Sequence, residues 1–205
     1  MKTLKLRIKD KHAKTLNELA SEVNFVWNYC NDLCFKHLQR TGKFFSAFDV
    51  AKYTAGASKS GLNLHSQTIQ AIAEELVLRR KQFKKAKLRW RVSNPKSAKK
   101  SLGWIPFKAS GIKYQNGQVK YAGRFFGLWD SYGLSKFNIK MGSFSQDSRG
   151  RWYLNAVVET EKTVTTAVDS VGIDLGLKDF ATLSNGEKIA AQQTYRGDEN
   201  KLNDI

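Results

Sequence analysis

The sequence contains few of the residues that build disulfide frameworks or zinc sites. Its 205 residues include two Cys, three His and two Pro. Cys30 and Cys34 lie four residues apart in a helical pattern, without the Cys-x-x-Cys spacing or nearby His residues typical of zinc sites. We therefore predict two buried thiols on one helix face, no zinc site, and structural or surface positions for His12, His37 and His65.

The chain also lacks long hydrophobic runs. No stretch of about 18 apolar residues is present, so the sequence predicts no membrane-spanning helix. Residues 1–9 alternate charged and apolar side chains and lack the continuous apolar core of a signal peptide. Hydrophobic residues at 41% and aromatic residues at 12% are typical of folded protein. We expect a cytoplasmic protein without a membrane partner.

Acidic residues are missing from a long central stretch. The net charge is +17, and residues 76–129 contain 15 Lys and Arg residues without one Asp or Glu. Residues 171–205, by contrast, carry four basic and six acidic residues. A solvated surface normally mixes both signs, so a one-signed stretch of this length indicates a polyanionic partner. The stretch also holds nine aromatic residues, and rings interleaved with cations suit nucleic acid.

Helices are predicted in the first half of the chain. Residues 13–38 carry apolar side chains at the three- and four-residue spacing of an amphipathic helix, and a short helix is expected at 46–53. A second long helix, capped by Ser66, is predicted to continue through the basic residues at 84–91. Residues 93–101 end it as a basic connector. Its predicted buried stripe consists of Ile69, Ile72, Leu76, Phe83 and Trp90.

Strands are predicted at the N-terminus and after Trp104. Residues 2–9 alternate basic and apolar side chains, as in a strand with one buried face. Asn116-Gly117 predicts a hairpin turn, and residues 151–159 read as a further strand. The order of helices and strands therefore predicts an α+β, multidomain fold.

The candidates for phosphate contacts lie at the end of the predicted second long helix. They are Lys84, Lys85, Lys87, Arg89 and Arg91. Lys and Arg side chains neutralise phosphates, and no acidic residue nearby in the sequence competes for these five. The alternative is a solvated helix face. Among the aromatic residues of this region, Trp104, Phe107 and Trp129 are expected in the core.

A strand with a single carboxylate marks the last part of the chain. Residues 171–175 read Val-Gly-Ile-Asp-Leu, which places Asp174 at the end of an apolar strand. Gly176 permits close approach of backbone or substrate. Divalent cations such as Mg²⁺ prefer oxygen ligands, and two-metal phosphodiester cleavage needs several converging carboxylates. Asp174 is thus a candidate metal ligand that requires partners.

Two alternatives to a nuclease strand exist for this segment. One is an Asp in an ordinary turn at the end of a strand. The other is the first phosphate motif of actin-like proteins and sugar kinases, in which Thr or Ser normally stands at the position of Leu177. Downstream, Asn185-Gly186 predicts a two-residue hairpin turn, with Asp179 and Glu187 as surface residues of that hairpin.

The longer segment at 173–189 resembles the first RuvC-like motif of the TnpB (OrfB) family. These are transposon-encoded RNA-guided DNA endonucleases, long described as transposases and related to type V CRISPR effectors. Residues 150–159 are similar to the strand just before the family's nuclease domain. More loosely, the resemblance includes residues 64–70 and 104–108. It therefore touches most of the chain and is most specific at 150–189.

The resemblance implies a domain organisation and a set of partners. Residues 1–10 and 102–165 would form a wedge-type, oligonucleotide-binding β-barrel that grips guide RNA. Residues 11–101 would form a helical recognition domain for the guide–target heteroduplex. Residues 168–205 would be the first strands of an RNase H-like (RuvC) domain. Asp174 maps onto the family's first catalytic carboxylate, a ligand of Mg²⁺.

Family members continue with a second catalytic carboxylate, a zinc ribbon and a third carboxylate. The acidic residues after Asp174 match none of these later motifs. We therefore expect a truncated, nucleic-acid-binding protein that does not cleave DNA alone and whose strands at 171–191 leave an edge and an apolar face uncovered. Two alternatives are a nuclease completed by a separate C-terminal fragment and a non-cleaving RNA-guided regulator.

Overall fold

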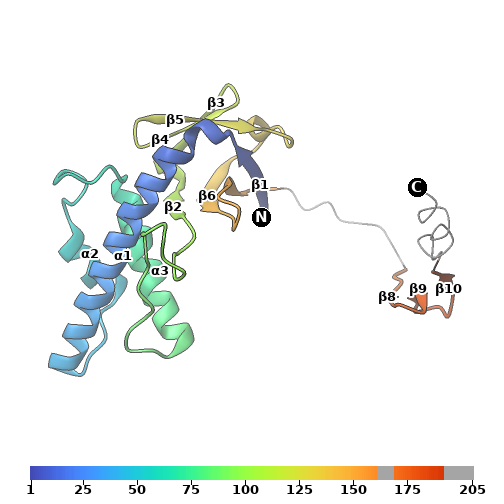
Figure 1. Cartoon of the computed structure of the whole chain (residues 1–205), viewed down its shortest axis with the longest axis horizontal. Helices are drawn as coiled ribbons and strands as arrows, with labels where there is room; N and C mark the ends of the chain where they lie inside the picture. The colour runs from blue at the N-terminus through green and yellow to red at the C-terminus, as the bar shows by residue number, and fades with distance from the viewer. Residues whose placement is uncertain (161–168, 192–205) are drawn as a thin grey trace. The chain divides into compact units, whose positions relative to one another are not determined.

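The computed structural model of the chain describes residues 1–160 and 169–191 and divides into two compact units (Figure 1). Unit 1 comprises Met1–Glu161, and unit 2 comprises Lys162–Ile205. The boundary predicted between residues 165 and 168 falls outside the described residues. The assignment of wedge, recognition and nuclease domains to these parts stays a prediction.

Three α-helices and one short 3-10 turn follow the first strand of unit 1. Their bounds are β1 Lys2–Ile8, η1 Asp10–His12, α1 Ala13–Thr41, α2 Ala47–Thr54 and α3 Ser66–Phe83. The apolar stripe of α1 is buried as its spacing predicts, including Leu16, Val23 and Cys30 at 0% exposure. No described helix is long and apolar enough to cross a membrane.

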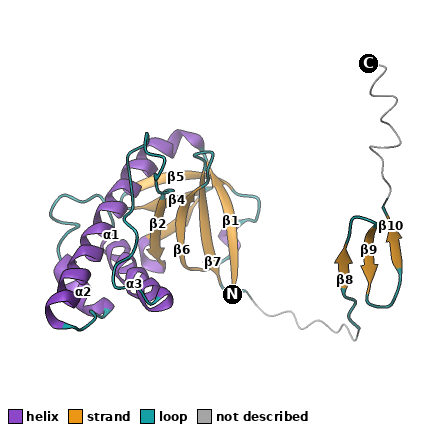
Figure 2. Cartoon of the chain, turned by 60° about the horizontal axis from the view of Figure 1, so that its bottom comes forward, coloured by secondary structure: helices purple, strands orange, loops and turns teal. Residues whose placement is uncertain are grey.

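The rest of unit 1 is a single antiparallel sheet. Its strands are β2 Trp104–Lys108, β3 Ile112–Gln115, β4 Gln118–Tyr121, β5 Arg124–Trp129, β6 Ile139–Gln146 and β7 Trp152–Val158. With β1 they lie in the order β2-β6-β7-β1-β5-β4-β3. The two edge strands, β2 and β3, are joined directly by the 3-10 turn η2 (Ala109–Gly111), so the sheet curves into a nearly closed barrel beside the helices (Figure 2). The predicted α+β class is confirmed.

Aromatic side chains fill the inner face of the sheet. The ring of Phe144 is fully buried, and the rings of Phe107, Tyr121 and Phe126 lie 5.4, 5.4 and 5.6 Å from it. Such tilted and edge-on arrangements are favourable for aromatic pairs. A Cβ at Gly142 would overlap the ring of Phe107 and the backbone oxygen of Asn155, so this position of β6 requires glycine.

A buried threonine joins α3 to the sheet. The hydroxyl of Thr68 donates to the backbone oxygen of Pro106 at 2.8 Å and shares a hydrogen bond with the Tyr121 hydroxyl at 2.7 Å. Thr68 is fully buried and Tyr121 is 1% exposed, so water cannot replace either bond. The same burial raises the pKa of Tyr121 to about 12. Thr68 therefore fixes the position of the helix on β2 and β4.

Replacing Thr68 with valine should destabilise unit 1 by about 2–4 kcal/mol, because a buried carbonyl and a buried phenol each lose a partner. Urea unfolding followed by circular dichroism measures this change. Thr41→Val is the matched control, since Thr41 lies exposed at the end of α1. Its effect should stay within roughly 0.5 kcal/mol. Equal stability of the two variants would contradict the role assigned to Thr68.

The predicted second long helix is shorter than its apolar pattern indicates. It ends at Phe83, and Lys84 takes a left-handed conformation (φ 50°). The N–H of Lys84 donates to the carbonyls of Arg80 and Lys81. Phe83 and Trp90, predicted on the buried stripe, are 55% and 47% exposed. The prediction was wrong because tertiary hydrogen bonds beyond Lys84 override helix propensity.

The N-terminus of this helix also differs from the prediction. His65 is the N-cap, and its Nδ1 accepts a hydrogen bond from the Gln67 N–H at 3.2 Å. Ser66, which we predicted as the cap, is the first helical residue. The other histidines are structural as well. His12 Nε2 accepts from the Gly127 N–H at 3.0 Å, and the His37 ring stacks on Phe45 at 3.6 Å.

Cys30 and Cys34 are free thiols, both fully buried on α1. Burial raises the pKa of Cys30 to about 12, with a further contribution from Cys34. The prediction of two buried thiols on one helix face is confirmed.

Unit 2 contains a three-stranded antiparallel sheet among its described residues. Its strands are β8 Ile173–Leu175, β9 Asp179–Leu183 and β10 Lys188–Ala190, in the order β10-β9-β8. The predicted two-residue turn at Asn185-Gly186 is wrong. Leu183 and Glu187 pair across three residues, with Gly186 at φ 89° closing the loop. At Asn116-Gly117 in unit 1, by contrast, the two-residue turn is confirmed, with φ of 48° and 73°.

One face of the described sheet of unit 2 is apolar and open to solvent. Ala181 pairs with Leu175 on one side and Ile189 on the other, which places all three on the same face. Leu175 is 69% exposed, Ile189 is 45% exposed, and Ile173 on the same face is 62% exposed. The prediction of an uncovered apolar face therefore holds for the described residues.

Candidate nucleic-acid interface

The basic segment after α3 runs along α1 without forming a helix or a strand. Residues 84–91 leave the helix at Phe83 and pass beside the middle of α1, where three asparagine side chains face them. These asparagines are Asn24, Asn28 and Asn31, at the spacing of one helix face. We call this row the asparagine stripe.

Two asparagines of the stripe, Asn28 and Asn31, bind the backbone of the basic segment through paired hydrogen bonds. Asn31 donates to the Leu88 carbonyl at 2.7 Å and accepts from the Leu88 N–H at 3.0 Å. Asn28 makes the same pair of bonds to Arg91, both at 2.8 Å. An amide side chain carries one donor and one acceptor group, so it satisfies both backbone polar groups of one residue. The segment is therefore held by its backbone.

Of the five predicted phosphate contacts, three remain free. Lys84, Lys85 and Arg89 are exposed and form no ion pair with a described residue. Because the backbone of Leu88 is anchored by Asn31, the neighbouring Arg89 projects from a fixed point. A preorganised cation loses less conformational freedom on binding a phosphate than one on a mobile chain.

The other two predicted contacts are engaged within the protein. Lys87 pairs with Asp32 at 3.5 Å and lies 5.3 Å from the Trp90 ring centre. Arg91 is half-buried, donates to Asn24 Oδ1 at 2.5 Å and to the Leu102 carbonyl at 2.7 Å, and burial lowers its pKa. Both residues hold the segment in place, and a phosphate contact by either stays a prediction.

A pocket of about 410 Å³ opens beside the anchored segment. Its walls combine aromatic rings with cations, and no acidic residue lines it. The lining includes Trp27, Phe83, Trp90, Arg79, Lys85 and Arg89. The exposed rings of Phe83 and Trp90 offer stacking surfaces, and the cations offer phosphate contacts. This composition suits a nucleic-acid strand.

A second basic and aromatic surface covers the outer face of the sheet. Lys5 Nζ and the Arg7 guanidinium lie 4.5 and 5.6 Å from the Tyr153 ring centre, and Lys9 Nζ lies 5.4 Å from that of Trp129. Trp129 is 64% exposed, so its predicted place in the core is wrong, whereas Phe107 is buried as predicted and Trp104 is half-buried. The alternation of β1 directs its basic residues outward, away from Leu4, Leu6 and Ile8.

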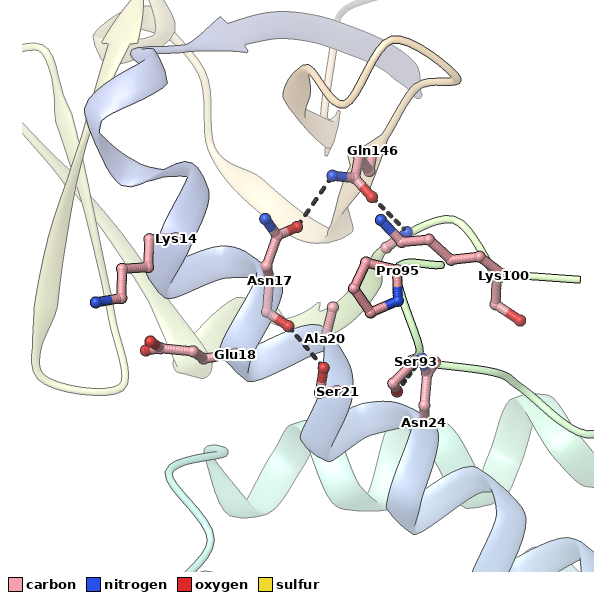
Figure 3. Close-up of a pocket in the computed structure, with 12 residues that line it drawn as sticks. Lys14, Asn17, Glu18, Ala20, Ser21, Asn24, Ser93, Pro95, Lys100 and Gln146 are labelled. Atoms are coloured by element: carbon pink, nitrogen blue, oxygen red, sulfur yellow. Dashed lines mark hydrogen bonds between the residues drawn. The ribbon is translucent and has the colours of Figure 1, made fainter. Parts of the chain in front are cut away.

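Another hollow, of about 510 Å³, lies between α1 and the connector at 93–101 (Figure 3). Asn17 Oδ1 accepts hydrogen bonds from Gln146 Nε2 at 3.0 Å and Trp152 Nε1 at 3.3 Å, which ties α1 to the sheet. Asn24 donates to Ser93 Oγ at 3.0 Å and holds the connector. The side chains here bond to one another, so this hollow is best explained as a structural joint.

Asp174 stands alone among the described residues of unit 2. It lies on β8 opposite Thr182, which in turn pairs with Lys188 on β10. Asp179 forms an ion pair with Lys188 at 3.5 Å. Within 1–160 and 169–191, no three His, Cys, Asp or Glu side chains are grouped so as to hold a metal ion. These residues alone therefore do not fit a Mg²⁺ site.

One curated protein shares significant sequence similarity with the chain. It is a "Putative RNA-guided DNA endonuclease" from Streptomyces pristinaespiralis, 33% identical over 113 residues. The match covers 52% of this chain and 28% of that protein, so the chain corresponds to less than a third of this relative. No protein-family model matches the chain.

Two solved structures have partly similar backbones. One is a CRISPR-Cas12f ternary complex, with a TM-score of 0.49 and 11% identity over 96% of this chain and 51% of that one. The other is a Cas12f1–sgRNA–target DNA complex, with a TM-score of 0.40 and 16% identity over 99% of this chain and 60% of that one. The sequence match agrees with the resemblance carried by residues 150–189.

Proposed function

We infer that this chain is a TnpB-like protein, and we propose that it binds guide RNA and target DNA as the N-terminal portion of a transposon-associated RNA-guided DNA endonuclease. The observation that carries this proposal is the anchored basic segment. It presents Lys84, Lys85 and Arg89 without an acidic partner among residues 1–160 and 169–191, beside a pocket lined with aromatic rings. Cations contact phosphates and exposed rings stack on bases, so the two features together match a nucleic-acid strand.

The outer face of the sheet supports the same proposal independently. Lys5, Arg7, Tyr153 and Trp129 line a shallow pocket of about 440 Å³ on unit 1, together with Asp130 and Ser131. Small curved β-sheets that bind oligonucleotides use such combinations of cations and rings. We propose that this face grips guide RNA, while the basic segment contacts the guide–target duplex.

We further propose that Asp174 is the first carboxylate of a Mg²⁺-dependent nuclease site. The lone carboxylate does not hold a metal pair, and the described residues form no group of three possible ligands with it. In this proposal the described residues grip nucleic acid, and cleavage requires further carboxylates. Such carboxylates from a separate C-terminal fragment would complete the site, and without them the chain would act as a non-cleaving RNA-guided binder.

Purification of the 205-residue chain from its host should recover bound RNA, because the free cations select polyanions. The RNA is identified by sequencing, and affinity for it should fall steeply as salt rises, since binding releases counterions. Recovery without RNA, together with weak binding that salt does not change, would contradict the proposed function.

The purified chain should show no Mg²⁺-dependent DNA cleavage in the presence of the recovered RNA. Robust cleavage that disappears in Asp174→Ala would refute the need for further carboxylates. Asp179→Ala is the matched control in the same sheet, because Asp179 is engaged by Lys188. Cleavage that survives both substitutions would indicate a contaminating nuclease.

A further inference from the structure

A buried arginine without a hydrogen-bond partner lies in the helical part of unit 1. Arg80, on the last turn of α3, is 4% exposed. None of its three guanidinium nitrogens has a hydrogen-bond partner within the described part of the chain. Glu75, the acidic residue preceding it most closely in the sequence, pairs instead with Arg79 at 2.6 Å. The guanidinium charge is therefore uncompensated by the residues described.

An uncompensated buried guanidinium is unfavourable, and arginine cannot relieve the cost by losing its proton. The polar group beside it is the thiol of Cys34. Burial raises the pKa of this thiol, and Arg80 offsets the rise only in part, so the thiol stays neutral. The Phe44 ring contacts the guanidinium, with 4.7 Å between Arg80 Cζ and the ring centre. Such a contact stabilises a cation without neutralising it. A bound anion would compensate this charge.

A pocket of about 280 Å³ opens at this position. It is lined by Phe44, Phe45, Val77, Arg80, Lys81 and Lys84. Three basic residues thus line a space just below the range of roughly 300–1,000 Å³ typical of sites for small molecules. Phe44 is 62% exposed, so its ring remains accessible as a stacking surface. Cations and an accessible ring are the two elements that recognise a nucleotide.

We propose that this pocket binds one nucleotide of a single-stranded nucleic acid, with its phosphate on Arg80, Lys81 and Lys84 and its base against Phe44. This inference rests on the proposed nucleic-acid-binding function and extends it to a nucleotide site. Lys84 connects the two, because it lines the pocket and begins the basic segment. A strand that follows Lys84, Lys85 and Arg89 therefore reaches the pocket without leaving the cationic surface.

Binding of a short single-stranded RNA by the full chain, measured by fluorescence anisotropy, tests the pocket. Arg80→Met should weaken binding by about 10- to 100-fold, because a charged hydrogen-bonding group to phosphate is lost. Phe44→Ala should weaken it by about 10-fold through loss of stacking. Phe48→Ala is the matched control. Phe48 is 72% exposed on α2 and does not line the pocket, so the Phe48→Ala variant should bind the RNA with unchanged affinity.

The melting temperature of the ligand-free protein separates binding from folding. Arg80→Met should raise the Tm by roughly 2–4 °C, because methionine removes an unpaired buried charge. Inorganic phosphate and a mononucleotide should each raise the Tm of the wild-type chain and leave that of Arg80→Met unchanged. A lower Tm in Arg80→Met, with RNA affinity equal to the wild type, would assign Arg80 a structural role and overturn the proposal.

The outcomes also distinguish this inference from the proposed function. If the wild-type chain binds RNA and both pocket variants bind it equally well, the pocket is refuted and the proposed function stands. If the wild-type chain binds no RNA while the mononucleotide still protects it through Arg80, the proposed function fails and the pocket takes a free nucleotide. If a protein-derived acidic peptide protects the chain and nucleotides do not, the nucleotide assignment is overturned.

Discussion

Replacing Lys84, Lys85 and Arg89 together with glutamine should weaken nucleic-acid binding by about 10- to 100-fold at moderate salt. These are the three predicted phosphate contacts that form no ion pair within the described part of the chain. Each phosphate contact contributes about 0.7 to the salt slope for single strands, so the slope of log affinity against log salt should fall by about 2. Anisotropy titrations at several salt concentrations measure both quantities.

A second triple variant separates the position of the charges from their number. Lys14, Arg40 and Lys59 are exposed residues of unit 1 outside both the basic segment and the sheet, and changing them to glutamine removes the same net charge. Their loss should reduce affinity only slightly, through the weaker long-range field. Equal losses in the two triple variants would show that net charge alone attracts nucleic acid, and the anchored segment would have no special role.

Replacing Asn31 with alanine should destabilise unit 1 by about 2–4 kcal/mol. Asn31 is fully buried, and its amide satisfies both the N–H and the carbonyl of Leu88. Alanine leaves both backbone groups buried without partners. The basic segment, rich in lysine and arginine, should then become accessible to trypsin. Urea unfolding gives the change in stability, and mass spectrometry of early tryptic fragments locates the new cleavage sites within 84–91.

Asn28→Ala provides the comparison for this effect. Asn28 makes the same two bonds to Arg91 but is half-buried, so water can replace part of what is lost. We expect a loss of about 1 kcal/mol. RNA affinity should fall in both variants, and more in Asn31→Ala, because the cations lose their fixed position. Unchanged tryptic cleavage in Asn31→Ala would contradict the anchoring role of the asparagine stripe.

Local patterns in the sequence were sufficient for most elements of the fold. The strand at 2–9, the amphipathic helix at 13–38, the hairpin at Asn116-Gly117 and the strand at 151–159 all appear close to their predicted bounds. In these strands and this helix, buried side chains recur with the period of the element, and the turn residues suit the backbone of the turn. Local sequence therefore suffices to predict them.

The end of α3 shows where such patterns are insufficient. The apolar spacing predicted a helix through Trp90, but the segment from Leu88 to Arg91 pairs with Asn28 and Asn31, about 60 residues away in the sequence. No local pattern identifies those partners. The signal available in the sequence was the row of asparagines on a helix whose other inward residues are apolar, because such polar groups require a partner when buried.

The residues of the candidate site were predicted only in part, for the same reason. The charge pattern identified the basic segment, but the fold divides its five cations into free ones and ones engaged by Asp32 and Asn24. Trp129 was predicted in the core because large rings usually lie there, yet it faces outward beside Lys9. Asp174 was identified from a motif, and its catalytic role stays a prediction.

The place of β1 in the sheet has a consequence for how the chain folds during synthesis. The strand of this sheet that is synthesised first is central, with Lys2 paired to Val158 and Ile8 paired to Leu128. The helices can form while translation continues, but β1 has no neighbour on either side until most of unit 1 has emerged. Closure of such distant pairs is slow. The nascent chain therefore exposes an unpaired apolar strand for much of its synthesis, and we expect the basic residues Lys5 and Arg7 of that strand to disfavour its association with other chains.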